Sequence, residues 1–398
     1  MFSLDEMLRD ELAAIQQAHR YRSRKIIDVI DPVAPVHARV RVDGIDTECV
    51  NFCSNDYLGL SGHIEVRHAL AAAAERYGAG SGSAHLVTGH SSEHHLLEEE
   101  LAAFVGRDRA LCFSTGYMAN LGIASALFKR GDAVIEDRLN HASLLDAGLQ
   151  QGVEFSRYQH NDLNLLRSYL AISKSTRKWV LSDGVFSMDG TVAQLNDLAS
   201  LCHQHEAWLM IDDAHGFGVL GTHGQGSVQA AGLSASEVPI YMATLGKALG
   251  VFGAFVAGSH ELIETLIQKS RTYIYTTATP PAIAAATRAA LKLLQRETWR
   301  RELLHTHIKR FRSGAKQLGL KLQDSCTAIQ PLIIGNEAEA LHASVLLLQQ
   351  GFVVTAIRPP TVPKGTARLR ITLSTAHSEG DIDRLLEALS TLQRISLP

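Results

Sequence analysis

Short apolar runs that alternate with helix-like stretches restrict the fold of this 398-residue chain more than any other feature. The runs, in chain order, are "RALCFS", "DAVIED", "KWVLSD", "AWLMIDD" and "IYMATL". Helical patterns such as "GYMANLGIASALF" and "LNDLASLCHQH" stand between them. Strands that are apolar throughout and separated by helices are typical of βαβ units whose sheet is covered on both faces. We therefore predict an α/β fold with a mostly parallel sheet.

The two ends of the chain carry other patterns. Residues 4–20 place their apolar side chains on one helical face, and "VHARVRVDGIDTECVNF" alternates around Asp43-Gly44 as a β-hairpin does. Towards the C-terminus a charged helical stretch is followed by "AIQPLIIG", "GFVVTAI" and "ARLRITL", which alternate with two helices. The expected parts are an N-terminal helix-and-hairpin segment at 1–45, a large domain at 46–284 and a smaller α+β domain at 285–398.

Composition places the chain among soluble globular proteins. Hydrophobic residues make up 46% and charged residues 20%, and the net charge is −3 without a block of Lys or Arg. These values argue against nucleic acid or an anionic membrane as a partner. The N-terminus is amphipathic and acidic rather than a signal peptide, no apolar run could span a bilayer, and the five cysteines are scattered. We expect reduced thiols and a cytoplasmic location.

Residues suited to ligand chemistry follow the predicted strands. In open α/β sheets, ligands bind outside the carboxyl ends of the strands, so these residues share one edge of the sheet. In chain order they are Gly116 and Tyr117 at a helix start, His141, Ser187, Asp212, His215, Thr244 and Lys247. Together they offer backbone N–H groups for an anion, an aromatic ring, an acid, an imidazole and an amine. This edge therefore predicts a binding or catalytic site.

Lys247 stands among small and apolar residues in "MATLGKALG". On this stretch alone, the favoured interpretation is a loop lysine that reaches water along its methylene stem. The alternative is a desolvated amine that acts as a nucleophile or forms a Schiff base. Each of the other residues also has a structural explanation of its own, such as a helix start, a turn cap or a core histidine. Taken together, these structural explanations are less convincing than a shared site, because all of them would have to hold at one edge of the sheet.

The sequence does not match either of two nucleotide-binding motifs that it partly resembles. A P-loop would need glycine where Tyr241 stands, and serine or threonine in place of Ala248. The stretch "YGAGSGSA" is rich in glycine, but it follows a predicted helix rather than a strand. A glycine-rich dinucleotide site of the Rossmann type is therefore not expected.

The chain has 19 histidines, so metal sites need consideration. The adjacent His94 and His95 of "SSEHHLL" point in different directions on a helix, and no HExxH motif is present. We interpret both as helix-surface or interface histidines and predict no metal site.

One cofactor matches the whole set of side chains at the sheet edge. Pyridoxal 5'-phosphate (PLP) has an aldehyde, a pyridine nitrogen, a flat ring and a phosphate. Lys247 would hold the aldehyde as a Schiff base, and Asp212 would keep the pyridine nitrogen protonated. His141 would stack on the ring, and His215 would hydrogen-bond the ring hydroxyl. Thr244 and the helix start after the first predicted strand would hold the phosphate.

The chain resembles the α-oxoamine synthases, fold-type I enzymes that use PLP, through nearly its whole length. The landmarks, in order, are "NFCSNDYLGL", "SSEHHLLEEELA", "FSTGYMANLG", "DRLNHASLLDA", "DGVFSMDG", "LMIDDAHGFGVLG", "TLGKALG", "YIYTTATPP" and "RLRITLSTAH". The resemblance implies a large domain with a mostly parallel seven-stranded sheet and a smaller α+β C-terminal domain. It also implies a homodimer with the active site at the interface, where Thr276 or Thr277 of the partner chain touches the phosphate.

Two segments, "DSCTAIQPLIIG" and "VTAIRPPTVPKGTARLRITLS", favour one activity within the family. The resemblance implies condensation of L-alanine with a pimeloyl thioester, carried by acyl carrier protein (ACP) or coenzyme A (CoA), in biotin synthesis. Glycine C-acetyltransferase, serine palmitoyltransferase and 5-aminolevulinate synthase are the alternatives within the family. A catalytically silent binding protein on the same fold is the alternative of a different class, against which the intact Lys247, Asp212 and His215 argue.

The resemblance also assigns roles to individual residues. Catalytic roles fall on Lys247, His141, Asp212 and His215, and cofactor contacts on Gly116, Tyr117, His141, Ser187, Asp212, His215, Thr244, Lys247 and Thr277. Arg370 in "RLRITL" matches the arginine that holds the amino-acid carboxylate, and Thr361 in "RPPTVP" matches a substrate contact. Arg22 matches an N-terminal substrate arginine, with Arg20 and Arg24 as alternatives. His141 is expected to contact the substrate as well.

Overall fold

The computed structural model describes residues 3–18 and 20–396, and the chain divides into two compact units. The small unit consists of Met1–Ser54, Met188–Gly190 and Leu303–Pro398, and the large unit consists of Asn55–Ser187 and Thr191–Glu302. These limits differ from those of the predicted segments 1–45, 46–284 and 285–398, and that division stays a prediction.

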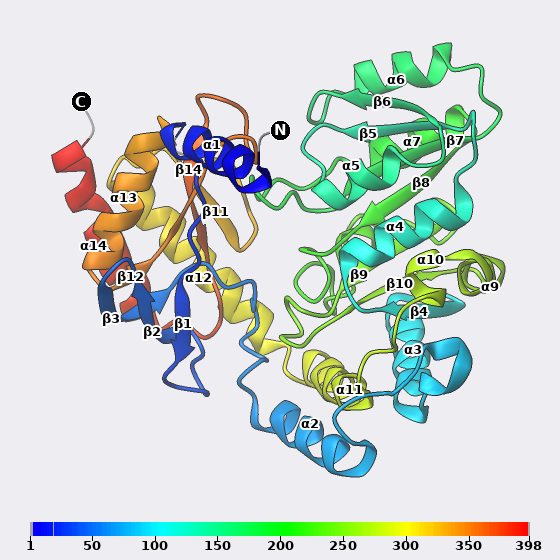
Figure 1. Cartoon of the computed structure of the whole chain (residues 1–398), viewed down its shortest axis with the longest axis horizontal. Helices are drawn as coiled ribbons and strands as arrows, with labels where there is room; N and C mark the ends of the chain where they lie inside the picture. Colours follow the sequence, from blue (N-terminus) through cyan, green and yellow to red (C-terminus); the bar gives the residue numbers. More distant parts are fainter. Residues whose placement is uncertain (1–2, 19, 397–398) are drawn as a thin grey trace. The chain divides into compact units, whose positions relative to one another are not determined.

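The large unit is built on one large sheet. Its strands are β4 (Arg109–Phe113), β5 (Ala133–Asp137), β6 (Glu154–Tyr158), β7 (Lys178–Asp183), β8 (Ala207–Asp212), β9 (Ile240–Thr244) and β10 (Ala254–Gly258). In the described residues the seven strands lie in the order β4-β10-β9-β8-β7-β5-β6 (Figure 1). Pairing is parallel from β9 through β8, β7 and β5 to β6, whereas β10 is antiparallel to both of its neighbours. The predicted α/β fold with a mostly parallel sheet is confirmed.

Helices cover this sheet, and the composition of the strands explains why. The helices are α2 (Ile64–Tyr77), η1 (His85–Gly89), α3 (Ser92–Val105), α4 (Gly116–Leu127), α5 (Ala142–Gly148), α6 (Leu163–Ile172), α7 (Leu195–Gln204), α8 (Ser227–Ala230), α9 (His260–Lys269), α10 (Arg271–Ile274) and α11 (Pro281–Arg296). Every residue of β5 and β10 is buried, so neither strand shows the alternation of a sheet with one wet face. Ile123 of α4, Leu144 of α5 and Leu266 of α9 share one core with Leu181 and Met242 of the strands. This packing fixes the N-termini of α4 and α5 at the carboxyl ends of β4 and β5.

The small unit contains two small sheets in its described residues. One sheet has β1 (Ile26–Val29), β2 (His37–Val42), β3 (Ile45–Asn51) and β12 (Phe352–Val353), and the other has β11 (Ile329–Gly335), β14 (Ala367–Thr372) and β13 (Thr355–Ile357). The helices of this unit are α1 (Leu4–Gln17), most of α12 (Trp299–Gln317), α13 (Glu337–Gln349) and α14 (Glu379–Ser396). Antiparallel β2 and β3 form the predicted hairpin, in which Asp43 and Gly44 have positive φ values of 49° and 81°. Two successive positive φ values indicate a type I′ turn, which the Asp-Gly pair favours.

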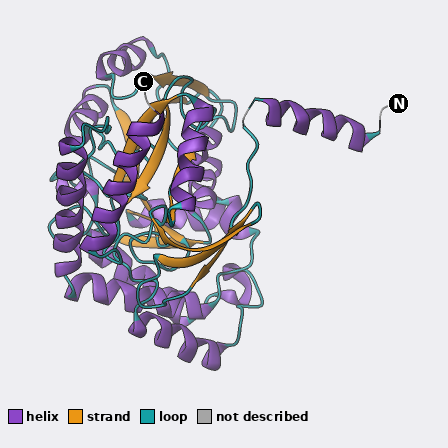
Figure 2. Cartoon of the chain, turned by 90° about the vertical axis from the view of Figure 1, so that its left-hand side faces the viewer, coloured by secondary structure: helices purple, strands orange, loops and turns teal. Residues whose placement is uncertain are grey.

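The N-terminal helix α1 (Leu4–Gln17) confirms the helix predicted within 4–20, of which position 19 lies outside the described residues. Ser3 caps it, and the Ser3 N–H donates to the Glu6 carboxylate at 2.9 Å, which closes a capping box. None of the residues of α1, the helix at the N-terminus in Figure 2, is buried. In the part of the chain that the structure describes, no helix combines the length and apolar character needed to cross a membrane.

Candidate active site

The carboxyl edge of the large sheet holds a cavity of about 190 Å³. Its lining residues are Gly116, Tyr117, His141, Ser143, Asp183, Val185, Ser187, Asp212, Ala214, His215, Met242, Thr244 and Lys247. All the residues that the sequence assigned to the cofactor are among them, with the exception of Thr277. They lie at or beyond the carboxyl ends of β4, β5, β7, β8 and β9, where an open α/β sheet binds its ligands.

The N-terminus of α4 forms one wall of the cavity. Thr115, which follows β4, caps this helix, and its Oγ1 accepts a hydrogen bond from the Met118 N–H at 3.1 Å. The first N–H groups of an α-helix have no carbonyl partner within the helix, and they form the positive end of its dipole. Gly116 and Tyr117 begin α4 at the cavity, so this wall is suited to a phosphate or a carboxylate.

Lys247 lines the cavity beside a histidine–tyrosine pair. Its Nζ lies 2.7 Å from Nε2 of His215, and Nδ1 of His215 lies 2.5 Å from the hydroxyl of Tyr57. An imidazole that is hydrogen-bonded at both nitrogens is fixed in orientation. Tyr57 is only 1% exposed, so the support comes from the interior of the large unit. This position favours the desolvated amine over the surface lysine as the interpretation of Lys247.

Asp212 ends β8 with a side chain that is almost fully buried, at 5% exposure. Its Oδ1 accepts a hydrogen bond from the Ala214 N–H at 3.0 Å, and its Oδ2 accepts one from the Asn120 amide at 2.8 Å. A buried carboxylate needs such donors or a cation, because an unpaired charge away from water is strongly unfavourable. Donors from its own turn and from α4 thus hold Asp212 at the cavity.

Asn120 connects Asp212 with His141. Nδ2 of Asn120 also donates to Ser143 Oγ at 2.8 Å, and this Oγ lies 2.7 Å from Nδ1 of His141. Burial lowers the pKa of His141, the negative charge of Asp212 opposes this effect, and the positive charge of Lys247 adds to it. A neutral imidazole, fixed where α5 begins, can stack against a flat ring.

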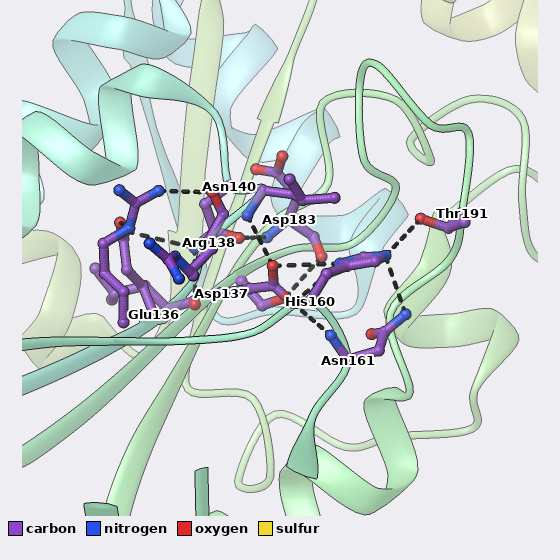
Figure 3. Close-up of polar contacts among 12 residues, drawn as sticks. Glu136, Asp137, Arg138, Asn140, His160, Asn161, Asp183 and Thr191 are labelled. Atoms are coloured by element: carbon purple, nitrogen blue, oxygen red, sulfur yellow. Dashed lines mark hydrogen bonds and ion pairs between the residues drawn. The ribbon is translucent and has the colours of Figure 1, made fainter. Parts of the chain in front are cut away.

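A second carboxyl group, that of Asp183, pairs in register with Asp212 on the neighbouring strand. Burial and the charge of Asp212 raise the pKa of Asp183 well above its usual range. Its Oδ2 accepts a hydrogen bond from the backbone N–H of His141 at 3.1 Å, which fixes the turn that carries the ring. Figure 3 shows the polar network behind this turn, where Asn140 accepts from the Asp183 N–H at 3.0 Å and donates to the Leu181 carbonyl at 2.9 Å.

The predicted substrate residues lie in the small unit. Arg22 and Thr361 line a second cavity of about 580 Å³, and Nη2 of Arg22 lies 3.5 Å from Oγ1 of Thr361. Arg20 and Arg358 line the same cavity. Arg370 is a buried residue of β14 and is not among the residues that line either cavity. The structure thus groups Arg22 with Thr361 and does not bring Arg370 to them.

Thr276 and Thr277 lie between α10 and α11, on a segment anchored to the turn before η1. The Ala278 N–H donates to the Ser83 carbonyl at 2.9 Å, and the Ser81 hydroxyl donates to the Ala278 carbonyl. Neither threonine is among the residues that line the 190 Å³ cavity of its own chain. That one of them reaches the phosphate of a partner chain stays a prediction.

Sequence reasoning missed Ser143 and Asp183 at the cavity, and the buried Asn120 and Tyr57 behind it. Asn120 lies one helical turn after Gly116 in α4, so its spacing placed it on the same face of the helix. Asp183 is the last residue of β7 and therefore occupies a strand end. Reading one turn into each helix, as well as the strand ends themselves, would have found both.

The fold and the cavity define the class of the molecule, that of the fold-type I aminotransferases. The family model described as aminotransferase class I and II matches residues 47–389. An 8-amino-7-oxononanoate synthase from Methylococcus capsulatus is 58% identical over 379 residues, 95% of this chain and 96% of the relative. The enzyme of the same name from Saccharophagus degradans is 56% identical over 392 residues, 98% of each chain. The chain belongs to the 8-amino-7-oxononanoate synthase family.

Solved structures confirm the fold. A serine palmitoyltransferase from Sphingomonas wittichii has a TM-score of 0.91 at 28% identity and covers 98% of this chain and 97% of its own. An 8-amino-7-oxononanoate synthase from Francisella tularensis has a TM-score of 0.77 at 32% identity, with 87% of this chain and 98% of its own covered. Similarity of shape therefore does not separate these two members of the group. The predicted fold class and the predicted family are confirmed.

Proposed function

We propose that the chain catalyses the PLP-dependent condensation of L-alanine with a pimeloyl thioester, with loss of carbon dioxide, to give 8-amino-7-oxononanoate for biotin synthesis. The carrier of the pimeloyl group is ACP or CoA. The observation that carries this proposal is 55–58% identity, over nearly the whole chain, to relatives named for that product. The cavity that gathers Lys247, Asp212 and His141 supports it, because these are the groups that such a reaction needs.

The residues of the 190 Å³ cavity fit PLP. Lys247 would hold its aldehyde, Asp212 would pair with its pyridine nitrogen, and His215 would hydrogen-bond its ring hydroxyl. Thr244, Ser187 and the N-terminus of α4 offer donors to its phosphate and ring. A serine palmitoyltransferase with a TM-score of 0.91 and 29% identity was solved with PLP. When bound, PLP supplies an electron-withdrawing ring that stabilises negative charge at the α-carbon of an amino acid.

The proposed reaction assigns one task to each of five side chains. Nζ of Lys247 would take the α-proton once the amino group of alanine has replaced it on the cofactor, and His215, 2.7 Å away, would keep the freed amine in place. Asp212, fixed by two hydrogen bonds, would keep the ring nitrogen of the cofactor positively charged. Arg370 binds the carboxylate of alanine through its planar guanidinium. His141 positions or protonates the oxygen of the acyl group.

The cavity of the small unit is the proposed site of the acyl substrate. Arg22 and Thr361 line it together with Arg20 and Arg358. The pimeloyl group ends in a carboxylate and both carriers contain phosphate, so a cavity rich in arginine matches either anion. The volume of about 580 Å³ also leaves room for a chain longer than an amino acid.

The proposal includes a homodimer in the cytoplasm. Thr276 and Thr277 do not line the cavity of their own chain, which fits a contact with the phosphate bound by a partner. Tyr275, next to them, is 72% exposed, as expected of an aromatic residue that another subunit covers. The free state of the cysteines supports a reducing compartment.

The test is an assay of the purified, PLP-loaded enzyme with L-alanine and pimeloyl thioester, in which the product is detected by its mass. The ACP and CoA forms are compared directly. Glycine and serine replace alanine, and acetyl, succinyl and palmitoyl thioesters replace the pimeloyl form, as matched controls. Product from another pair alone would assign the chain to another α-oxoamine synthase activity. The absence of product with every pair would favour a silent binding protein.

A further inference from the structure

Three histidines meet at the start of α3, outside the candidate active site. His85 opens η1, a single π-helical turn, His90 follows this turn, and His94 lies in the first turn of α3. One ring nitrogen of each histidine lies within 4.8 Å of those of the others. The Nδ1 atoms of His85 and His90 are 3.1 Å apart. We call these three residues the histidine cluster.

His94 corrects the interpretation drawn from the sequence. It is 0% exposed, whereas the side chain of the next residue, His95, is 65% exposed. The expectation of a surface or interface position is therefore wrong for His94 and confirmed for His95. The reason is that η1 and the residue Thr279 pack over the start of α3, which helical periodicity does not reveal.

Hydrogen bonds and burial leave the rings neutral. The carbonyl of Thr279 can only accept, so Nε2 of His94 donates to it at 2.7 Å, and the lone pair of His94 lies on Nδ1. Nδ1 in turn accepts from the Ser91 N–H at 3.1 Å. Metal-ligating histidines commonly donate their second ring N–H to a backbone carbonyl in this way. Burial lowers the pKa of all three rings, that of His85 to about 3. Neighbouring histidines add to this effect at His85 and His90, whereas the hydrogen bond to Thr279 and the charge of Glu93 oppose it at His94.

We propose that the histidine cluster binds one Zn²⁺ ion, with one nitrogen from each ring and a water molecule as the fourth ligand. Two nitrogens on one tetrahedral zinc, each about 2.0–2.1 Å from the metal, are roughly 3.4 Å apart. The 3.1 Å between His85 and His90 is close to this separation. At His94 the ion takes the place of the N–H and the hydroxyl of Ser91, which lie 3.1 and 3.0 Å from Nδ1. The acidic neighbour Glu93 is engaged by Arg288 at 2.7 Å, so imidazoles define the site and favour zinc over magnesium or calcium.

A bound ion would connect segments that are distant in the chain. It would join the η1 turn to α3, and the hydrogen bond from His94 to Thr279 extends the connection to the segment that carries Thr277. His85 also stacks on Tyr273, with ring centroids 5.1 Å apart and planes inclined by 10°. We therefore expect zinc to raise the thermal stability of the protein. Zinc binding at this cluster does not depend on the proposed activity.

The experiment is a zinc titration of the PLP-loaded enzyme, free of affinity tags and treated beforehand with a chelator. Calorimetry gives the stoichiometry and affinity, and thermal unfolding with and without zinc gives the stabilisation. The variants are His90→Ala and, as the matched control, His95→Ala, which removes a histidine outside the cluster. Every protein carries Cys326→Ser, because this exposed thiol could bind zinc itself.

The parent and His95→Ala are expected to bind one ion per chain with micromolar or tighter affinity and to unfold at higher temperature with zinc. His90→Ala is expected to bind at least about tenfold more weakly and to show no such rise. If His90→Ala does not fold, His90→Gln is compared in its place. A parent that binds no stoichiometric zinc would overturn the proposal, and so would a His90 variant that binds as tightly as the control.

Discussion

The two cavities differ in how firmly their side chains are held. In the large unit, each of the side chains of Lys247, Asp212 and His141 has a close polar partner, at 2.7, 2.8 and 2.7 Å respectively. In the small unit, Arg22 is exposed and lies 3.5 Å from Thr361, too far for a strong hydrogen bond. Strand ends and helix starts carry the first set, whereas loops carry the second. The comparison teaches that the fold itself arranges the cofactor site, while the acyl site can adapt to its ligand.

The largest effect is expected from Lys247→Ala, which removes the amine at the centre of the firmly held cavity. Among the residues that the structure describes, no other lysine lines this cavity, so turnover should fall by about 10³-fold or more. Lys269→Ala, on the exposed end of α9, is the control. Borohydride reduction and peptide mass analysis should find PLP on the peptide that contains Lys247. Normal turnover of the variant, or PLP on a different peptide of the parent, would contradict the assignment.

Asn120→Leu should have the next largest effect, because it breaks the link between Asp212 and His141. A buried carboxylate that loses a donor is destabilised by about 1–3 kcal/mol, so we expect a 10- to 100-fold loss of turnover. Since Asn120 acts through Asp212, the pH dependence of the absorbance of bound PLP should also shift. Ser143→Ala removes the contacts with His141 and Asn120 but keeps the hydrogen bond from Asn120 to Asp212, so it should leave that pH dependence in place. If the pH dependence of this absorbance is unchanged in Asn120→Leu, the role of Asn120 is limited to packing.

The parts of the fold and site that could be predicted are those that depend on residues close together in the sequence. Asp212 and Lys247 follow strands whose apolar runs are visible in the sequence, and the Asp-Gly turn depends on two adjacent residues. β6 and β10 do not stand out in the same way. The residues "EFSRY" of β6 form a partly exposed edge strand, and "AFVAG" of β10 has one β-branched residue. A strand count of seven therefore came from the family resemblance and not from the runs.

Contacts between distant segments could not be predicted from spacing. Asn120 and Ser143 are 23 residues apart, and His94 meets Thr279 from 185 residues away. Such pairs meet only after the sheet and its helices have packed, so no local periodicity encodes them. The same holds for the partners of Asp212, whose donor Asn120 lies on another element.

Arg22→Ala tests the looser cavity and should have a smaller effect. One charged hydrogen bond to an anion contributes about 1.5–3 kcal/mol, so the KM for the pimeloyl thioester should rise about tenfold or more. The KM for L-alanine should change little. Arg24→Ala is the control, because Arg24 does not line this cavity. A larger effect from Arg20→Ala would assign the role of the substrate arginine to Arg20 instead of Arg22. A rise confined to the KM for alanine would contradict the placement of the acyl substrate in this cavity.

The smallest effect on activity is expected from Glu136→Gln, which instead changes how the stability of the protein depends on pH. Burial raises the pKa of Glu136 to about 7, although Arg157, 3.3 Å away, opposes the shift. The folded state thus favours the protonated carboxyl. The stability that Glu136 contributes to the folded state is complete at a pH below 4.5, the usual pKa of the carboxyl, and is lost as the pH rises to about 7. In the small unit, burial lowers the pKa of His377 to about 4, so its contribution is lost in the opposite direction, as the pH falls below 6.5.

Glutamine at position 136 does not titrate, so the variant should gain on the parent as the pH rises from 4.5 to about 7. The difference in the free energy of unfolding should grow by up to about 1.4 kcal/mol per pH unit and then stay constant. Denaturant unfolding at several pH values measures it, and Glu154→Gln, an exposed residue of the adjacent strand, is the control. A difference that stays flat across this window would mean that Glu136 is ionised in the folded protein, with Arg157 as a full counter-charge.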